Sequence, residues 1–115
     1  MSRAVVVEQF GGPEVLEVRE VAEPHAGPGQ VRVRVSAAGL NPSDWKRIGA
    51  ASAAAARGLT LPTGFGYDLA GTVDEVGDGV TGFAVGDRVY GGAPGRAVAE
   101  LAVLTPGADR VAHTP

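Results

Sequence analysis

A glycine-rich hexapeptide, Gly77 to Gly82, reads GDGVTG and matches the pattern G-x-G-x-x-G letter for letter. In nucleotide-binding domains this pattern forms a loop whose glycines let the backbone approach the pyrophosphate of a dinucleotide. That chemistry needs a strand before the loop and a helix after it, because the phosphates bind at the N-terminus of the helix. The flanking residues therefore decide whether the match is meaningful.

The residues after the hexapeptide do not favour a helix. The sequence TVDEV before it is typical of a strand, but FAVGDRVYGGAPG follows, and four glycines and a proline in that segment prevent a long helix. Glu100 has about the spacing, near 20 residues, of an acid that binds a ribose, yet the intervening helix is missing. We therefore predict that GDGVTG is a hairpin-type turn between two strands.

Metal and thiol chemistry have few candidates in this chain. The sequence contains no cysteine, which excludes disulfides, thiolate ligands and thiol nucleophiles. Its two histidines, His25 and His113, lie in separate segments typical of turns. Zinc sites need about three or four protein ligands. We expect no metal site, and we expect both histidines to be solvated surface residues.

The elements that would position a site are mainly strands. Val31, Val33 and Val35 alternate with Arg32 and Arg34, a pattern typical of a half-buried strand. Further strands are predicted in RAVVVEQF, VLEVREV, DLAGTVDEVG, DRVYG and RAVAELAVL, with Ala97, Ala99, Leu101 and Val103 sharing one face of the last. The sequence NPSDWKRIG predicts a short helix that Pro42 begins and Gly49 ends. Strands joined by short glycine turns predict a mostly β fold, an antiparallel barrel or sandwich with one or two short helices.

Length and charge narrow the class of protein. The 115 residues fit one domain, and the formal charge of −3 does not favour binding to nucleic acid. No segment approaches the roughly 18 consecutive apolar residues of a membrane span. We expect a soluble, cytoplasmic protein with neither nucleic acid nor membrane as its partner.

Five segments in order resemble a known family. They are FGGPEVLEV, AAGLNPSDWK, LPTGFGYDLAGTVDEVGDGVTGF, VGDRVYG and AVAELAVL, and they span nearly the whole chain. This order resembles the N-terminal domain of the medium-chain dehydrogenases/reductases, in the branch of the zinc-independent quinone oxidoreductases. The resemblance implies that residues 1–115 form a GroES-like antiparallel β-barrel, and that the Rossmann domain binding NADPH is absent from this chain. It also implies hydride transfer from NADPH to a quinone, enone or similar conjugated carbonyl, by a protein that can be a homodimer at full length.

The resemblance implies two catalytic candidates. In the zinc alcohol dehydrogenases of this superfamily, a Cys and a His bind the catalytic metal where this sequence has Asn41 and Tyr67. The Tyr67 phenol is then expected to donate a hydrogen bond to the substrate oxygen, or alternatively to pack at the barrel edge with its hydroxyl in water. Asn41 is expected beside the nicotinamide, with a local Asn-Pro turn as the alternative. We predict that both lie on one concave face, within reach of a common small ligand and without zinc.

The residues that follow Asn41 are expected near the cofactor. By resemblance the cofactor contacts are Asn41, Pro42, Ser43, Asp44 and Trp45. Asp44 is expected to cap or brace this segment, and Trp45 to anchor the core or form a wall of the cleft. Ser43 has the place of a proton-relay hydroxyl, although no metal alkoxide is expected for it to serve. Lys46 and Arg47 are expected in solvent, with a cofactor phosphate as the alternative contact.

Two further segments complete the sequence-based expectations. Asp87 is predicted to form a turn hydrogen bond at the start of a strand. The alanine-rich residues 50–58 are expected to be a loop or a short helix, with a lid over the cleft as their functional alternative. A second hypothesis makes the chain a stand-alone GroES-like barrel that serves as a binding or scaffold module. A co-chaperonin would need a mobile loop with bulky apolar anchors, which residues 50–58 lack.

Overall fold

The computed structural model of the chain describes residues 1–49 and 60–115. Its elements are β1 (Ser2–Val7), the 3-10 helix η1 (Pro13–Val15), β2 (Leu16–Val21), β3 (Val31–Gly39), α1 (Pro42–Gly49), β4 (Thr63–Gly64), β5 (Asp68–Val76), β6 (Arg88–Gly92), β7 (Leu101–Leu104) and β8 (Arg110–His113). The prediction of a mostly β fold with one or two short helices is confirmed. The alanine-rich segment 50–58, expected as a loop, helix or lid, lies outside the described residues.

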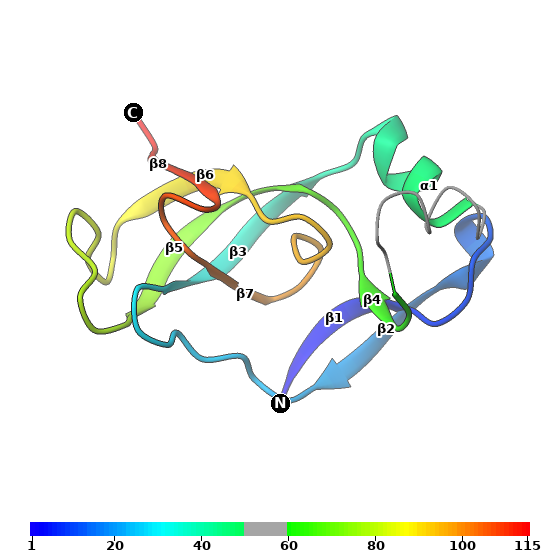
Figure 1. Cartoon of the computed structure of the whole chain (residues 1–115), viewed down its shortest axis with the longest axis horizontal. Helices are drawn as coiled ribbons and strands as arrows, with labels where there is room; N and C mark the ends of the chain where they lie inside the picture. The colour runs from blue at the N-terminus through cyan, green and yellow to red at the C-terminus, as the bar shows by residue number, and fades with distance from the viewer. Residues whose placement is uncertain (50–59) are drawn as a thin grey trace.

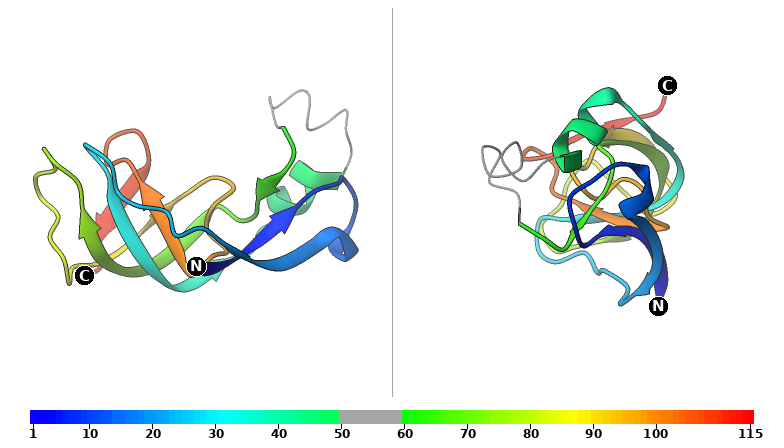
Figure 2. Two further views of the ribbon diagram at one scale, coloured as in Figure 1. Left: turned by 90° about the horizontal axis from the view of Figure 1, so that it is seen from below. Right: turned by 90° about the vertical axis from the view of Figure 1, so that its right-hand side faces the viewer.

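The strands form two antiparallel sheets. The three-stranded sheet has the order β2-β1-β4, and the five-stranded sheet has the order β7-β3-β5-β6-β8. Figures 1 and 2 show the sheets next to each other along the long axis, with α1 at the end of the molecule that holds the three-stranded sheet. Within the described residues, one isolated bridge between Ala4 and Ala99 connects the two sheets. The strands therefore do not close into one continuous barrel.

Each sheet has its own hydrophobic cluster. Val31 and Val33 are fully buried in the larger cluster, and Val35 packs against it from a half-buried position. The predicted alternation along this strand is confirmed, and a register irregularity between Val35 and Ala37 weakens it toward the end of β3. The smaller cluster lies under α1, where Phe65 and Ile48 are buried.

The hexapeptide GDGVTG lies in the connection between β5 and β6. No helix follows it, and Gly79 and Gly82 adopt φ angles of 80° and 87°. Only glycine reaches this left-handed region without strain. The prediction of a turn between two strands is confirmed, and the match to a dinucleotide loop is accidental.

The predicted strand RAVAELAVL is wrong in its extent and in its face. Only Leu101–Leu104 form β7, in which Ala102 and Leu104 are buried whereas Leu101 and Val103 are half-buried. The preceding residues leave the five-stranded sheet, since Val98 accepts a hydrogen bond from the Val5 amide and donates one to the Phe65 carbonyl. The chain bends as it passes between the sheets, and this bend breaks the alternation.

The described residues contain little helix. Their α-helix, α1, has eight residues, and none of their helices is long and apolar enough to span a membrane.

Candidate functional site

The site predicted from sequence begins where β3 passes into α1. Pro42 is the first residue of the helix, a position that requires no backbone N–H, and Asn41 precedes it. The Asn41 backbone N–H donates to Asp44 Oδ2 at 2.8 Å, and the Asp44 N–H donates to the Asn41 carbonyl at 2.9 Å. An acidic residue that reaches back from the third helical position in this way resembles a capping box. The predicted bracing role of Asp44 is confirmed.

The Asn41 side chain connects α1 to the five-stranded sheet. Its Nδ2 donates a hydrogen bond of 2.8 Å to Oδ2 of Asp68, the first residue of β5. Because the acceptor is a carboxylate, the bond fixes which end of the amide is the nitrogen. Tyr67 directly precedes Asp68. Asn41 thus contacts Asp68, the neighbour of Tyr67 in the sequence, but the structure records no direct contact between Asn41 and Tyr67.

Tyr67 lines a hollow of about 320 Å³ on the five-stranded sheet. The hollow is formed by Tyr67, Asp68, Gly92, Pro94, Ala108, Asp109 and Arg110. The Tyr67 carbonyl accepts a hydrogen bond of 2.6 Å from the Ala93 N–H, which fixes the backbone just before β5. Asn41 does not line this hollow, so the prediction that Asn41 and Tyr67 share one concave face stays a prediction.

The carboxylates of the hollow already have partners. Asp68 accepts the hydrogen bond from Asn41. Asp109 accepts one from Arg96 Nη2 at 3.0 Å and one from the Thr105 N–H at 2.8 Å. The Tyr67 hydroxyl and the Arg110 guanidinium have no hydrogen bond among the described residues, so both remain available as donors to a ligand.

The inner face of α1 is held by polar side chains as well as by apolar packing. Arg47 is buried, contrary to the expectation that it lies in solvent. Its guanidinium donates to the Gly64 carbonyl at 3.0 Å and to Thr63 Oγ1 at 2.6 Å. These partners lie in β4, far along the chain, so the sequence around Arg47 carried no signal of its burial.

Two neighbours of Arg47 on α1 also turn toward the core. The Trp45 ring packs on the Phe65 ring with centroids 5.1 Å apart, which confirms Trp45 as a core anchor. Asp44 is fully buried, and its Oδ1 has no hydrogen-bond partner among the described residues. The cofactor contacts predicted for residues 41–45 stay predictions.

The two histidines lie at the surface as predicted, but each faces a carboxylate. His25 Nδ1 lies 3.1 Å from Glu75, and His113 Nε2 lies 3.0 Å from Asp87. The Ala26 N–H, and then His25, lower the pKa of Glu75 below its usual value. The Ala84 N–H, and then His113, lower the pKa of Asp87 in the same way. The hydrogen bond from the Ala84 N–H to Asp87 Oδ2 also confirms the predicted turn bond.

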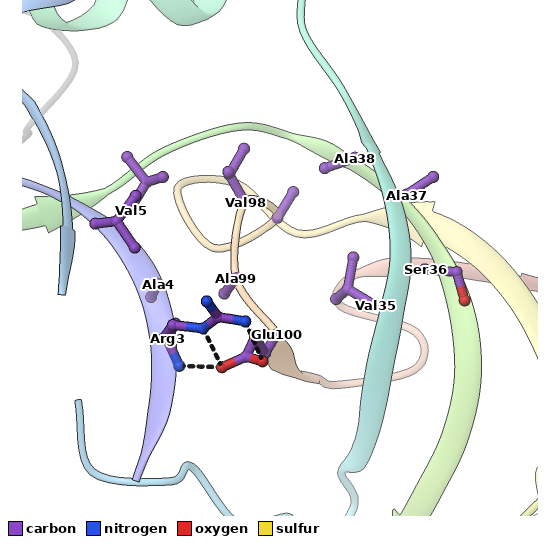
Figure 3. A pocket seen from close by; sticks show the side chains of 12 residues that line it. Arg3, Ala4, Val5, Val35, Ser36, Ala37, Ala38, Val98, Ala99 and Glu100 are labelled. Carbon is purple, nitrogen blue, oxygen red and sulfur yellow. Dashed lines mark hydrogen bonds and ion pairs between the residues drawn. The ribbon is translucent and has the colours of Figure 1, made fainter. Parts of the chain in front are cut away.

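A second hollow lies between the two sheets, as Figure 3 shows. It is lined mostly by valines and alanines of β1, β3 and the bend at residues 97–100. Its charged groups, Arg3 and Glu100, form an ion pair with a nitrogen-to-oxygen distance of 3.3 Å. This pairing lowers the pKa of Glu100. The hollow brings together none of the residues predicted to be catalytic.

The donor set of the site does not resemble a zinc site. Asn41, Tyr67 and Asp68 supply an amide, a phenol and a carboxylate, whereas zinc prefers thiolate and imidazole ligands. In the part of the chain that the structure describes, no three His, Asp or Glu side chains are grouped to hold a metal ion.

Comparison with known proteins identifies relatives over the whole chain. Residues 27–105 match the family described as alcohol dehydrogenase GroES-like domain. A quinone oxidoreductase of Pseudomonas aeruginosa is 42% identical over 117 residues, which cover 100% of this chain and 34% of that protein. A trans-enoyl reductase of Gibberella fujikuroi is 43% identical over 96 residues, covering 80% of this chain and 26% of the relative.

Solved structures share the fold. The Escherichia coli quinone oxidoreductase complexed with NADPH superposes with a TM-score of 0.80 at 27% identity, covering 98% of this chain and 33% of that one. The expected GroES-like fold is thereby confirmed. The chain spans about a third of the length of the Pseudomonas relative. Since the family match covers most of its residues, the chain belongs to the alcohol dehydrogenase GroES-like domain family.

Proposed function

We propose that this chain is the substrate-side, N-terminal domain of an NADPH-dependent oxidoreductase that reduces quinones, enones or similar conjugated carbonyls without zinc. The observation that carries the proposal is the hydrogen bond between Asn41 and Asp68. Because Asp68 directly follows Tyr67, this bond holds the two candidate residues Asn41 and Tyr67 in neighbouring parts of the fold. The names of the relatives support the class of substrate, because they include quinone oxidoreductases and a trans-enoyl reductase.

The Tyr67 phenol is the proposed electrophilic group. Negative charge develops on the substrate oxygen as a conjugated carbonyl accepts hydride, and a fixed donor stabilises that charge. Tyr67 lines the hollow, and its hydroxyl has no partner among the described residues, so it is available to donate. NADPH supplies the hydride, and this chain supplies the orientation and polarity around the carbonyl.

The start of α1 offers a hydrogen-bond acceptor that suits the carboxamide group of the nicotinamide cofactor. Asn41 Nδ2 is engaged by Asp68, while Asn41 Oδ1 accepts no hydrogen bond within the described residues. A carboxamide such as that of nicotinamide offers N–H donors to an acceptor of this kind. We propose that Asn41 orients the nicotinamide, together with the exposed Pro42 and Ser43. Asp44 acts through Asn41, which it braces.

The same contact supports the proposal that the site works without zinc. A catalytic zinc would have to replace the hydrogen bond between Asn41 and Asp68 by coordination to an amide and a phenol, both poor zinc ligands. We propose that this hydrogen bond connects the start of α1 to the start of β5, beside the positions Asn41 and Tyr67 that match two metal ligands in the zinc enzymes. The cytoplasmic location and the homodimer stay predictions.

The test uses a chimera in which this chain replaces the matching N-terminal third of the Pseudomonas aeruginosa relative. Replacing Tyr67→Phe removes the hydroxyl alone, and kcat for enone reduction should fall about 10- to 1000-fold, as for loss of an oxyanion donor. KM should change little, because the contact forms mainly in the transition state. The matched control is Tyr90→Phe, since Tyr90 is the other tyrosine and lies exposed on β6. An unchanged kcat in Tyr67→Phe would contradict the proposed role.

A further inference from the structure

A row of three residues crosses the five-stranded sheet at the hollow. Asp68 of β5 lies opposite Gly92 of β6, and Gly92 lies opposite Arg110 of β8. Residues directly opposite each other on antiparallel strands project from the same face of the sheet. The next residues along β5 and β8, Leu69 and Val111, belong to or pack against the larger core cluster. Asp68, Gly92 and Arg110 therefore project away from that core.

Gly92 leaves a notch in this row. Two strand spacings separate Asp68 from Arg110, a distance of about 10 Å between their backbones. A Cβ atom built on Gly92 would meet only the Tyr67 carbonyl, at 3.8 Å, which is an ordinary van der Waals distance. The space above Gly92 is thus open, and a side chain placed there would fill it without disturbing the backbone.

The notch lies between two side chains of opposite charge, Asp68 on one side and Arg110 on the other. Asp109, beside Arg110, is neutralised by Arg96 and by the Thr105 N–H. Asp68 accepts a hydrogen bond from Asn41 through Oδ2, but the Asn41 amide carries no charge to pair with the carboxylate. The Arg110 guanidinium, in contrast, forms neither an ion pair nor a hydrogen bond within residues 1–49 and 60–115. Arg110 and Tyr67 both line the hollow, and neither side chain has an acceptor among the described residues.

We propose that Arg110 is a specificity-determining residue that binds a second oxygen of the substrate, remote from the carbonyl that accepts hydride. This inference rests on the proposed function, in which Tyr67 holds the reacting oxygen. A para-quinone has carbonyl oxygens at opposite ends of its ring, so one faces Tyr67 while the other reaches across the Gly92 notch to Arg110. A simple enone has one oxygen and gains nothing from Arg110. The site therefore selects flat dicarbonyl substrates over monocarbonyl ones.

The turnover experiment compares para-benzoquinone with cyclohexenone in the chimera described above. Arg110→Gln should raise KM for the quinone about tenfold, as expected for one charge-assisted hydrogen bond, and leave KM for the enone unchanged. Arg110→Lys should recover most of the loss. Gly92→Val should also raise KM for the quinone and not for the enone, because the valine side chain fills the notch. The control is Arg88→Gln, an exposed arginine on the same face of the sheet that does not line the hollow.

A binding measurement separates this inference from the proposed reduction. Calorimetry of the chimera without NADPH should show hydroquinone binding more tightly than phenol, and Arg110→Gln should abolish the difference. Equal binding of hydroquinone and phenol by the unmodified chimera would overturn the role of Arg110, and so would equal losses for both substrates or an equal effect of Arg88→Gln. If Tyr67→Phe leaves turnover intact while the Arg110 effect persists, the proposed role of Tyr67 fails and the dicarbonyl subsite stands.

Discussion

The five-stranded sheet and the end of the molecule around α1 and β4 are stabilised by different interactions. The sheet encloses a cluster of nine buried aliphatic residues and depends on long β-ladders. Among the described residues, the cluster under α1 has four buried apolar residues, and two charged side chains, Asp44 and Arg47, are buried near them. Aliphatic packing tolerates changes of similar volume, whereas a buried polar contact is lost as soon as one partner is removed.

This difference concerns the site, because the site lies where the two regions meet. Asn41 is braced by Asp44 at the start of α1, and it bonds to Asp68 at the start of β5. Tyr67 directly precedes β5 and Arg110 begins β8, so both belong to the five-stranded sheet region, whereas Asn41 belongs to the α1 end. Substitutions in either core are therefore expected to affect mainly stability, whereas those at the junction, such as Asn41 and Asp68, are expected to affect mainly the geometry of the site.

The largest effect should come from the ring that fills the small cluster. Phe65 is almost fully buried and contacts Trp45. Phe65→Ala should lower the free energy of unfolding by about 3–5 kcal/mol, because the cluster is too small to close the cavity. Leu104→Ala in the large cluster should lower it by about 2–5 kcal/mol. Denaturant unfolding measures both values, with Val18→Ala at an exposed position as the control. A loss below about 1 kcal/mol for Phe65→Ala would mean that the α1 end has no core of its own.

The buried guanidinium should have the next largest effect. Arg47→Met keeps an apolar stem but leaves the Gly64 carbonyl and the Thr63 hydroxyl without their donor. We expect a loss of about 1–3 kcal/mol in unfolding free energy. The matched change Arg34→Met, at a side chain with 73% of its surface exposed, should have almost no effect. Equal losses for the two variants would remove the distinction between a polar α1 end and an apolar sheet.

The sequence predicted the two regions unequally, for a physical reason. Alternation along Val31 and Val33 is a local signal, and a sheet with one buried face preserves it. The turn at GDGVTG was equally predictable, because the surrounding glycines exclude a helix. The burial of Arg47 was not, since it depends on Thr63 and Gly64, which reach α1 only after folding. The bend at Val98 was missed for the same reason, because its partners Val5 and Phe65 lie on other segments.

The candidate site was predicted in the same uneven way. Asn41 and Tyr67 were found through resemblance, and the brace from Asp44 followed from its place in the first helical turn. The partner of Asn41, Asp68, was not singled out, although it stands next to Tyr67. Arg110 was also missed, because only the pairing of β6 with β8 brings it to the hollow.

A smaller effect on stability is expected at the junction of the two regions. Asp68→Ala removes the acceptor of the Asn41 amide at a position that is largely exposed. The unfolding free energy should fall by no more than about 1 kcal/mol, the usual net contribution of one hydrogen bond. The chimera should nevertheless lose activity, because the Asn41 amide is free to rotate. Asp78→Ala, in the β5–β6 turn, is the control. A variant with unchanged kinetics would show that the junction has no role in positioning Asn41.

The smallest effect should be the response of strands β6 and β8 to acid. The amides of α1 serve as the internal reference. The Ala84 N–H, and then His113, lower the pKa of Asp87 in the folded chain. A carboxyl whose folded pKa is depressed stabilises the fold above its unfolded pKa, near 3.9, and this contribution disappears as pH falls through the folded pKa. Amides of β6 and β8 should therefore lose protection from hydrogen exchange below about pH 4, relative to amides of α1.

The variant Asp87→Asn tests this acid response without removing the turn bond. Its amide oxygen can still accept the Ala84 N–H, but it does not titrate. The difference in protection between the chain and the variant should be present near neutral pH and vanish in strong acid, because the protonated carboxyl of Asp87 and the amide that replaces it are both uncharged. A difference that stays constant across this range would show that the charge of Asp87 does not stabilise the edge. The contrast between the two regions would then rest on packing and buried hydrogen bonds alone.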